Sequence, residues 1–308
     1  MIVYRELSSL EKDLGVSAKA LYTLSNQIHH HYRKVKIPKG NGEFRELSVP
    51  DDFLKAVQRK VADTLLSQEE ISAYATAYRP GGSTHRNAKP HVGKPMVMKL
   101  DIRGFFDHCI YPVVKERAFP AEKYSEPNRI LLTLLCVYKD ALPQGAPTSP
   151  AISNIILRDF DNVVGQWCNQ RNIAYTRYCD DMTFSGQFEP REVKAMVKTE
   201  LKKLGFFLND KKTVVLKNGQ RQSVTGITVN EKPQTSADYR RKLRQELYYC
   251  QKFGIEDHIQ RLGLNVPKDT YKARLLGRVN YALSVNPADR ELRQYKAWLM
   301  KEKLSIED

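Results

Sequence analysis

Two adjacent carboxylates, Asp180 and Asp181, are the side chains best suited to chemistry in this chain of 308 residues. They follow Tyr-Cys at 178–179, within a stretch of alternating polar and apolar residues that is rich in aromatic and β-branched types. This pattern predicts two short strands joined by an acidic turn. Adjacent carboxylates repel each other, so they suit a solvated turn or a divalent-cation site. Taken alone, the stretch favours the solvated turn, because Asp is common in turns.

A third acid, Asp101, ends a short segment at 96–101 that we expect to be a strand. Carboxylates at the carboxyl end of a strand lie where sheets place ligands. Asp101 is far from Asp180 in sequence, but neighbouring strands could bring the two together. In a basic protein, such a cluster suggests phosphoryl transfer assisted by two Mg²⁺ ions, which prefer carboxylate and phosphate oxygens.

The charge of the chain points to a polyanionic partner. Lys and Arg outnumber Asp and Glu by 50 to 35, giving a net charge of +15. Nucleic acid is the first candidate and an anionic membrane surface the second. No apolar run approaches the roughly 20 residues that span a bilayer, and the start of the chain lacks a signal-peptide pattern. The five cysteines are scattered and form no Cys-x-x-Cys pair, which favours reduced thiols in the cytoplasm.

The elements that must position these acids follow from hydrophobic periodicity and turn residues. Asn41-Gly42 predicts a basic hairpin over 36–50, and a further strand is expected over 222–229. Ser149 is expected to cap a long helix that continues to about residue 170. Other helices are expected over 4–30, 51–66 and 189–204 and from residue 236 onward. The last region is basic and carries tyrosines, which suits either a nucleic-acid backbone or a solvated face.

Four segments, taken in order, resemble the motifs of reverse transcriptases. Tyr-Cys-Asp-Asp at 178–181 resembles the Tyr-x-Asp-Asp signature of the family, and Leu-Asp-Ile-Arg-Gly-Phe-Phe at 100–106 resembles its first catalytic motif. Leu-Pro-Gln-Gly-Ala-Pro-Thr-Ser-Pro at 142–150 resembles the substrate-positioning loop, and the segment at 205–213 resembles the lysine motif. Each motif alone is weak, but the ordered set is specific and covers roughly residues 35–230.

Two further elements resemble those of the bacterial retron subgroup. Asn-Ala-Lys-Pro-His at 87–91 matches its Asn-Ala-x-x-His element, and Val-Thr-Gly at 224–226 matches an element late in the palm. Retrons usually carry Ala at the variable position of the signature, where this chain has Cys179. The departure leaves both acids intact.

The resemblance implies an α+β fold shaped as a right hand, with fingers, a palm built on an antiparallel catalytic sheet, and a C-terminal helical thumb. We expect a helical N-terminal extension over 1–34, fingers and palm over 35–235, and the thumb over 236–308. Asp101 and Asp180 would bind two Mg²⁺ ions, with the backbone carbonyl of Ile102 as a further ligand. Asp181 would support the site or ligate directly.

The resemblance also implies which residues meet the nucleotide. Phe106 would be the aromatic gate that crowds a ribose 2′-hydroxyl, a role compatible with a place in the core beside Phe105. Gln144 would contact the incoming dNTP, and Arg45 would meet its triphosphate. Whether Lys36 or Lys39 joins Arg45 is left open by the spacing.

Three more side chains have an implied functional role, and two of them, Lys212 and Asn87, also have a plain interpretation. Lys212 would donate a proton or contact phosphate near the leaving group, or would be an ordinary surface lysine. Asn87 and His91 would contact the structured RNA, whereas a cap or a turn is the plain alternative for Asn87.

In function, the resemblance implies an RNA-directed DNA polymerase that copies part of a cognate non-coding RNA. Priming from an internal guanosine 2′-hydroxyl would give branched, RNA-linked DNA (msDNA), in the service of phage defence with a separate effector or toxin protein. Alternatives are a group II intron-like or abortive-infection reverse transcriptase, a template-independent polymerase, or a nucleic-acid-binding scaffold that restrains a toxin.

Overall fold

The computed structural model describes residues 4–38 and 42–302, and the chain divides into two compact units. The first unit comprises Met1–Gly82, Met98–Phe184 and Phe188–Val215. The second comprises Ser83–Val97, Ser185–Gln187 and Leu216–Asp308. Lys39 and Asn41, at the tip of the expected basic hairpin, lie outside the described residues.

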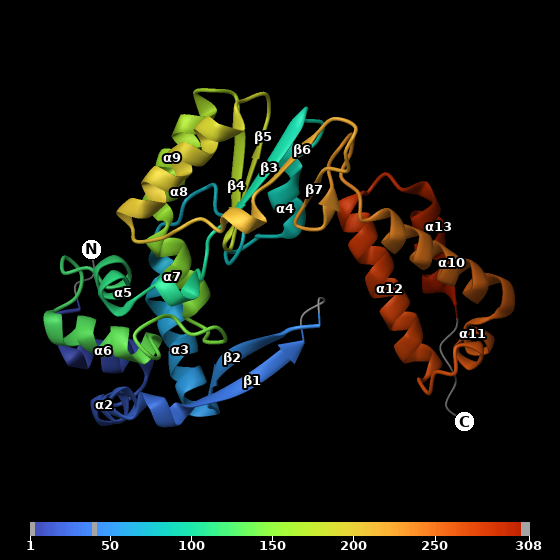
Figure 1. Cartoon of the computed structure of the whole chain (residues 1–308). Helices are drawn as coiled ribbons and strands as arrows, with labels where there is room; N and C mark the ends of the chain where they lie inside the picture. Colours follow the sequence, from blue (N-terminus) through green and yellow to red (C-terminus); the bar gives the residue numbers. More distant parts are fainter. Residues whose placement is uncertain (1–3, 39–41, 303–308) are drawn as a thin grey trace. The chain divides into compact units, whose positions relative to one another are not determined.

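Helices make up most of the first unit (Figure 1). Its helices are α1 (Leu7–Leu14), α2 (Ala18–Asn26), α3 (Asp52–Thr64), α5 (Tyr111–Ala118), α6 (Glu126–Cys136), α7 (Ser149–Ile156), α8 (Arg158–Asn169) and α9 (Pro190–Lys203), with short 3₁₀ turns at Ile28–His31, Leu66–Gln68, Phe106–His108 and Asp210–Lys212. The continuous helix expected over 4–30 is wrong, because Gly15 takes a left-handed conformation (φ +59°) that ends α1. The helix expected over 51–66 is confirmed, and the Asp51 carboxylate caps α3 by accepting from the backbone N–H of Leu54 at 2.9 Å.

The hairpin expected over 36–50 is confirmed. Strands β1 (Tyr32–Pro38) and β2 (Phe44–Pro50) are antiparallel, with Tyr32 opposite Pro50 and Pro38 opposite Phe44. In Figure 1 the two strands form a long ribbon in blue. This register places Arg45 on β2 opposite Ile37.

A four-stranded sheet carries the expected acids. Its order is β4 (Ala174–Tyr178), β5 (Asp181–Ser185), β3 (Met96–Asp101) and β6 (Val214–Lys217). Strand β3 runs antiparallel to β5, because Ile102 bonds to the carbonyl of Asp180 at one end and Gly186 to that of Met96 at the other. Helices α8 and α9 lie beside this sheet (Figure 1), and α9 buries Val193, Val197 and Leu201.

Three further expectations about single elements are wrong. The helix expected from Ser149 to about residue 170 is broken at Leu157, so that α7 and α8 each bury an apolar face of their own. Ser149 is not the cap: Thr148 precedes the helix, and the Ser149 hydroxyl donates to the carbonyl of Pro143 at 2.8 Å. The strand expected over 222–229 is a small hairpin, since Thr225 and Gly226 both take positive φ and form a tight turn.

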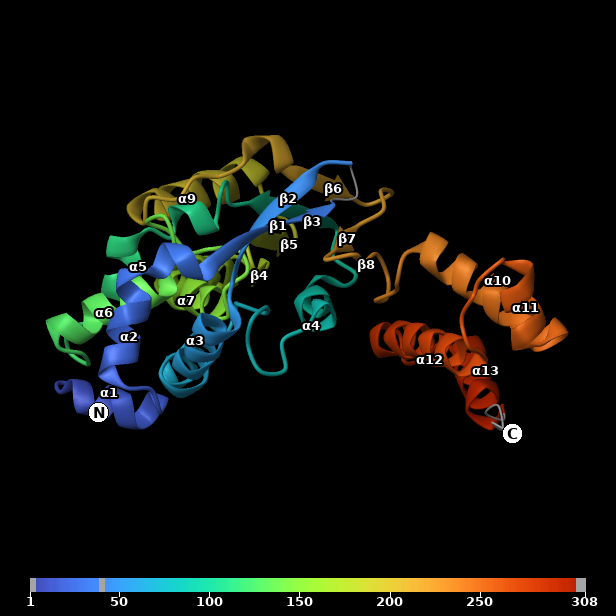
Figure 2. The same cartoon turned by 90° about the horizontal axis from the view of Figure 1, so that it is seen from below.

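The second unit has two cores of its own. One surrounds α4 (Thr84–Ala88), the 3₁₀ turn Lys89–His91 and the hairpin of β7 (Ser223–Val224) with β8 (Ile227–Thr228). The other is formed by α10 (Ala237–Phe253), α11 (Ile255–Arg261), α12 (Lys268–Val285) and α13 (Arg290–Lys301), which gather in one bundle (Figure 2). Ser236 caps α10, so the helical region begins where expected. No helix within residues 4–38 and 42–302 is both long and apolar enough to cross a membrane.

Candidate active site

The sheet brings the three predicted acids together. Asp101 ends β3, Asp181 begins β5, and Asp180 lies in the turn between β4 and β5. The backbone N–H of Ile102 donates to the carbonyl of Asp180 at 3.2 Å, which fixes the end of β3 against the turn. We call Asp101, Asp180 and Asp181 the acid cluster.

The charges of the acid cluster disturb one another. The pKa of Asp180 is raised, first by burial and then by the charge of Asp101. The pKa of Asp181 is raised to about 6 by desolvation and by the charges of Asp180 and Asp101, although the residue is partly open to solvent. Three carboxylates held close together in this way need a cation to be stable in their ionised form.

The donor chemistry of the acid cluster fits a divalent cation, because carboxylate oxygens and a nearby backbone carbonyl are hard ligands. In the arrangement described for residues 4–38 and 42–302, no three His, Cys, Asp or Glu side chains form a ready-made metal cage. A lysine supplies positive charge instead: the Lys212 ammonium donates to Oδ1 of Asp101 at 2.7 Å. This pairing is the largest cause of the raised pKa of Lys212.

A cavity of about 500 Å³ opens beside the acid cluster within the first unit. Its walls come from the β1–β2 hairpin, the end of β3, the β4–β5 turn and the loop before α7. The predicted site residues among those that line it are Arg45, Asp101, Ile102, Phe106, Gln144, Asp180 and Lys212. The structure therefore gathers in one place most of the side chains that the motifs singled out.

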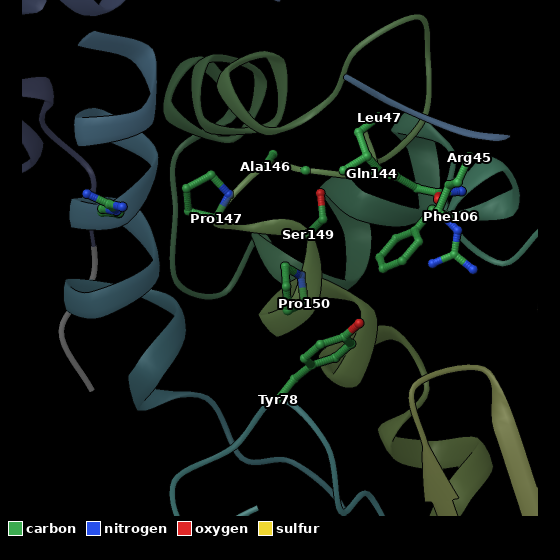
Figure 3. Close-up of a pocket in the computed structure, with 11 residues that line it drawn as sticks. Arg45, Leu47, Tyr78, Phe106, Gln144, Ala146, Pro147, Ser149 and Pro150 are labelled. Atoms are coloured by element: carbon green, nitrogen blue, oxygen red, sulfur yellow. The ribbon is translucent and has the colours of Figure 1, made fainter. Parts of the chain in front are cut away.

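A neighbouring cavity of about 450 Å³ shares Arg45, Phe106 and Gln144 with the first (Figure 3). The ring of Phe106 lies close to the Arg45 side chain in this view. Phe106 is half-buried and its ring centroid is 5.1 Å from that of the buried Phe105, so the gate and core interpretations are both compatible with its position. Arg59, on α3, also lines this cavity and was not predicted.

A close backbone contact joins the loop of Gln144 to the strand of Arg45. The N–H of Ser48 donates to the carbonyl of Gln144 at 2.8 Å. Gly145 has φ +126°, and a Cβ there would lie 2.8 Å from the carbonyl oxygen of Ser48, so only glycine fits. Lys36 lies on β1 opposite Glu46 and is not among the described residues that line either cavity.

Asn87 and His91 lie in the second unit, and both are buried. The Asn87 amide donates to the Thr225 hydroxyl at 3.4 Å, so the two retron-like elements meet each other. Nδ1 of His91 is 2.7 Å from the Ser185 hydroxyl, and burial lowers the pKa of this imidazole to about 3. In this arrangement both side chains contact protein atoms, and their contact with RNA stays a prediction.

The sequence did not predict several residues that line the site or support it from the protein interior. Tyr78 lines both cavities, and Arg177 and Asp161 form a fully buried ion pair beneath the β4–β5 turn. The available signals were an arginine inside a strand rich in aromatic residues and an aspartate on the apolar side of a helix, because charges are rarely buried unless paired.

Comparisons with known proteins agree with the geometry of the site. Residues 37–239 match the family model described as "Reverse transcriptase (RNA-dependent DNA polymerase)". The retron Mx65 reverse transcriptase of Myxococcus xanthus is 32% identical over 315 residues, covering 94% of this chain and 70% of the relative. The retron Ec83 reverse transcriptase of Escherichia coli is 33% identical over 231 residues, covering 69% of this chain and 72% of the relative.

Two solved structures show weaker likeness. Telomerase from Candida albicans has a TM-score of 0.47 at 11% identity, covering 89% of this chain and 66% of that one. A foamy viral protease-reverse transcriptase has a TM-score of 0.44 at 14% identity, covering 90% of this chain and 46% of that one. The assignment rests on the family model and on the curated relatives: the chain belongs to the reverse transcriptase family, as a retron-type RNA-directed DNA polymerase with the right-hand α+β fold.

Proposed function

We propose that the chain copies part of a cognate structured non-coding RNA into single-stranded DNA that stays joined to that RNA. The observation that carries the proposal is that Asp101 and Asp180 of the acid cluster line a cavity also lined by Arg45, Phe106 and Gln144. The retron reverse transcriptases among the relatives support the choice of product. Priming from an internal guanosine 2′-hydroxyl would make the product the branched molecule called msDNA.

Reverse transcriptases use divalent metal ions, and the acid cluster is the part of this chain suited to hold them. Asp101 and Asp180 would hold two Mg²⁺ ions with the carbonyl of Ile102, while Asp181 supports the site. When bound, such ions activate the attacking hydroxyl and neutralise the charge that develops on the leaving pyrophosphate.

The incoming dNTP would occupy the cavity beside the acid cluster. Arg45 would meet the triphosphate, because its guanidinium is suited to phosphate and lines the same cavity as Asp101 and Asp180. Gln144 would contact the nucleotide from the loop that Ser48 holds in place. The ring of Phe106 would exclude a 2′-hydroxyl and so favour dNTPs over rNTPs.

The reaction is nucleotidyl transfer. The oxygen of the primer hydroxyl forms a bond to the α-phosphorus, the bond from that phosphorus to the β-phosphate oxygen breaks, and pyrophosphate leaves. The ammonium of Lys212 lies at the edge of the acid cluster, where it can donate a proton to the pyrophosphate or bind it by charge.

Nucleic acid would be bound by more of the chain than the site itself. We assign fingers and palm to 35–235, a helical extension to 1–34 and the thumb to 236–308, whose bundle carries basic residues and exposed tyrosines. Asn87 would serve the RNA by fixing the Val224–Gly226 turn, since its amide donates to the Thr225 hydroxyl, and His91 would serve it from its buried place against Ser185.

The biological setting that fits this activity is phage defence in the cytoplasm, with a separate effector or toxin protein. Two observations support the compartment: the net charge of +15 suits nucleic acid, and the five cysteines are all free. The family of the relatives supports the link to a retron.

Primer extension on an RNA template tests the activity directly. With Mg²⁺ and dNTPs we expect the wild type and the control Asp107→Asn to extend a DNA primer according to the template, and a chelator to stop them. Asp101→Asn should lose roughly 10³-fold or more of the rate, because an essential carboxylate ligand is removed. Extension that ignores the template would contradict the proposal in favour of a template-independent polymerase, and RNA binding without any extension would favour a scaffold.

A further inference from the structure

A buried ion pair lies directly behind the acid cluster. Arg177, in β4, and Asp161, in α8, are both 0% exposed. Nη2 of Arg177 is 2.6 Å from Oδ2 of Asp161, and Nε is 2.9 Å from Oδ1. The Tyr175 hydroxyl donates to the same carboxylate at 2.7 Å. A buried charge is tolerated only when it is paired and hydrogen-bonded, and Asp161 supplies the opposite charge for Arg177.

The remaining donors of Arg177 reach the turn that carries two acids of the cluster. Nη1 donates to the carbonyl of Cys179 at 2.8 Å. Cys179 has φ +59°, a left-handed conformation that residues other than glycine seldom adopt. The peptide that this hydrogen bond holds joins Cys179 to Asp180, so the guanidinium fixes the direction in which the turn presents Asp180.

A second set of hydrogen bonds in the same network reaches the segment that carries Tyr78, which also lines the cavity. Nη2 of Arg177 donates to Oδ1 of Asn154, in α7, at 3.2 Å. The Asn154 amide in turn donates to the carbonyl of Ala77 at 2.9 Å and to that of Tyr78 at 3.4 Å. Tyr78 also has a left-handed backbone (φ +56°) and lines both cavities. The Arg177 guanidinium and the Asn154 amide thus hold two unusual backbone positions, Cys179 and Tyr78, whose side chains also contact each other.

We propose that Arg177 is a positioning residue for nucleotide incorporation, which aligns the acid cluster through Cys179 and the nucleotide-facing wall through Asn154 and Tyr78. The inference rests on the proposed function, because it names the residue that keeps the side chains of that site aligned. The planar fork of arginine is required, because its donors sit on three separate nitrogens that reach Asp161, Cys179 and Asn154. The three N–H groups of lysine start from one nitrogen, which could match the charge of Asp161 but could not span the same acceptors. Catalysis is sensitive to such alignment, because a displacement of about 1 Å can cost 10²-fold in rate.

Arg177→Lys tests the hydrogen bond from Arg177 to the carbonyl of Cys179, and Arg129→Lys is its matched control. Arg129 is also buried; it pairs with Glu116 and Glu126 and donates to the carbonyl of Phe119 at 2.7 Å, but it lines neither cavity.

For Arg177→Lys we expect kcat for dNTP incorporation to fall about 10- to 100-fold. KM for the dNTP should change less than about threefold, because Asn154 keeps its own hydrogen bonds to the carbonyls of Ala77 and Tyr78. Arg129→Lys should keep both constants, whatever it does to the melting temperature.

Asn154→Ala tests the second set of hydrogen bonds and keeps the proposal testable if Arg177→Lys does not fold. It leaves the bond from Arg177 to Cys179 in place but frees the backbone of Ala77 and Tyr78. We expect KM for the dNTP to rise roughly five- to tenfold with kcat changed less than about threefold, because the nucleotide wall loosens and the acids do not move. The two variants should therefore differ in which constant they change.

Kinetic constants are to be compared per folded molecule, with circular dichroism and RNA affinity measured alongside. Equal effects of Arg177→Lys and Arg129→Lys on kcat would overturn the proposal, since the pair would then be a general support of the fold. An unchanged KM in Asn154→Ala would overturn the claim that Asn154 positions the nucleotide-facing wall through Tyr78. Failure of the wild type to incorporate dNTPs would instead contradict the proposed function, so the two failures are distinguishable.

Discussion

The ammonium of Lys212 lies 2.7 Å from Oδ1 of Asp101, although 111 residues separate the two in sequence. The Asp101 side chain is 7% exposed, whereas that of Lys212 is 60% exposed. The pair therefore joins a buried carboxylate of the acid cluster to a largely exposed cation at the edge of the cavity. The Lys212 ammonium neutralises part of the negative charge of the acid cluster. The lysine side chain is long, so the ammonium can also reach a leaving group in the cavity.

Replacing Lys212 by Gln should slow nucleotide incorporation. We expect the single-turnover rate to fall roughly 10²-fold, because general-acid assistance to the leaving pyrophosphate is lost. Lys211→Gln, in the same 3₁₀ turn but outside the cavity lining, is the matched control and should keep the wild-type rate. Equal rates for the two variants would show that Lys212 is an ordinary surface lysine with no part in the reaction.

Phe106→Ala should relax the discrimination between dNTPs and rNTPs. The ring lines both cavities, so its loss opens space where a 2′-hydroxyl would be crowded. We expect the ratio of kcat/KM for dNTP over rNTP to drop about tenfold or more, since the gate acts by exclusion. Phe207→Ala removes an exposed ring that stacks on Arg103 and should leave the ratio unchanged. A ratio unchanged in Phe106→Ala would assign the selectivity to another residue.

The stability of the fold should depend on pH through His91. Burial lowers its pKa from 6.5 to about 3, so between these values the unfolded chain binds the proton and the folded chain does not. Its contribution is fully present above about pH 6.5 and is lost as the pH falls toward 3. Between pH 7 and pH 4.5 this group alone should cost about 2–3 kcal/mol of unfolding free energy.

His91→Asn should reduce the loss of unfolding free energy between pH 7 and pH 4.5, whatever the stability of the variant at pH 7. The amide can keep a hydrogen bond to Ser185 but binds no proton in this range. His30→Asn changes an exposed histidine and should retain the wild-type pH dependence. Denaturant unfolding at the two pH values measures the difference, and an equal loss in His91→Asn and the wild type would show that other groups cause the acid sensitivity.

The parts of the site that local sequence determines were predictable. The alternation around Asp180 and Asp181 and the acid at the end of β3 predicted strands and a turn, and the structure has them. The hairpin carrying Arg45 followed from its turn residues and its alternating pattern. The order of four motifs indicated that these distant segments share one site, and the cavity beside the acid cluster brings them together.

The parts that depend on tertiary contacts were not predictable. The apolar pattern continues through Leu157, so nothing local announced the break between α7 and α8. Strands β7 and β8 are too short for any periodicity to show. The pairing of Arg177 with Asp161 joins residues from different elements, and the burial of His91 depends on segments from elsewhere in the chain. In each case a contact between distant segments decides the structure.

The most direct measurement identifies the nucleic acid that co-purifies with the chain when it is expressed from its native locus. The wild type and Asp180→Asn are compared. Separate treatment with RNase and with DNase identifies what is bound. We expect short DNA joined to RNA in the wild type, and the same RNA without DNA in Asp180→Asn, because the variant removes a carboxylate of the acid cluster and leaves the basic surface intact. RNA alone in the wild type, or RNA-linked DNA in Asp180→Asn, would contradict the account.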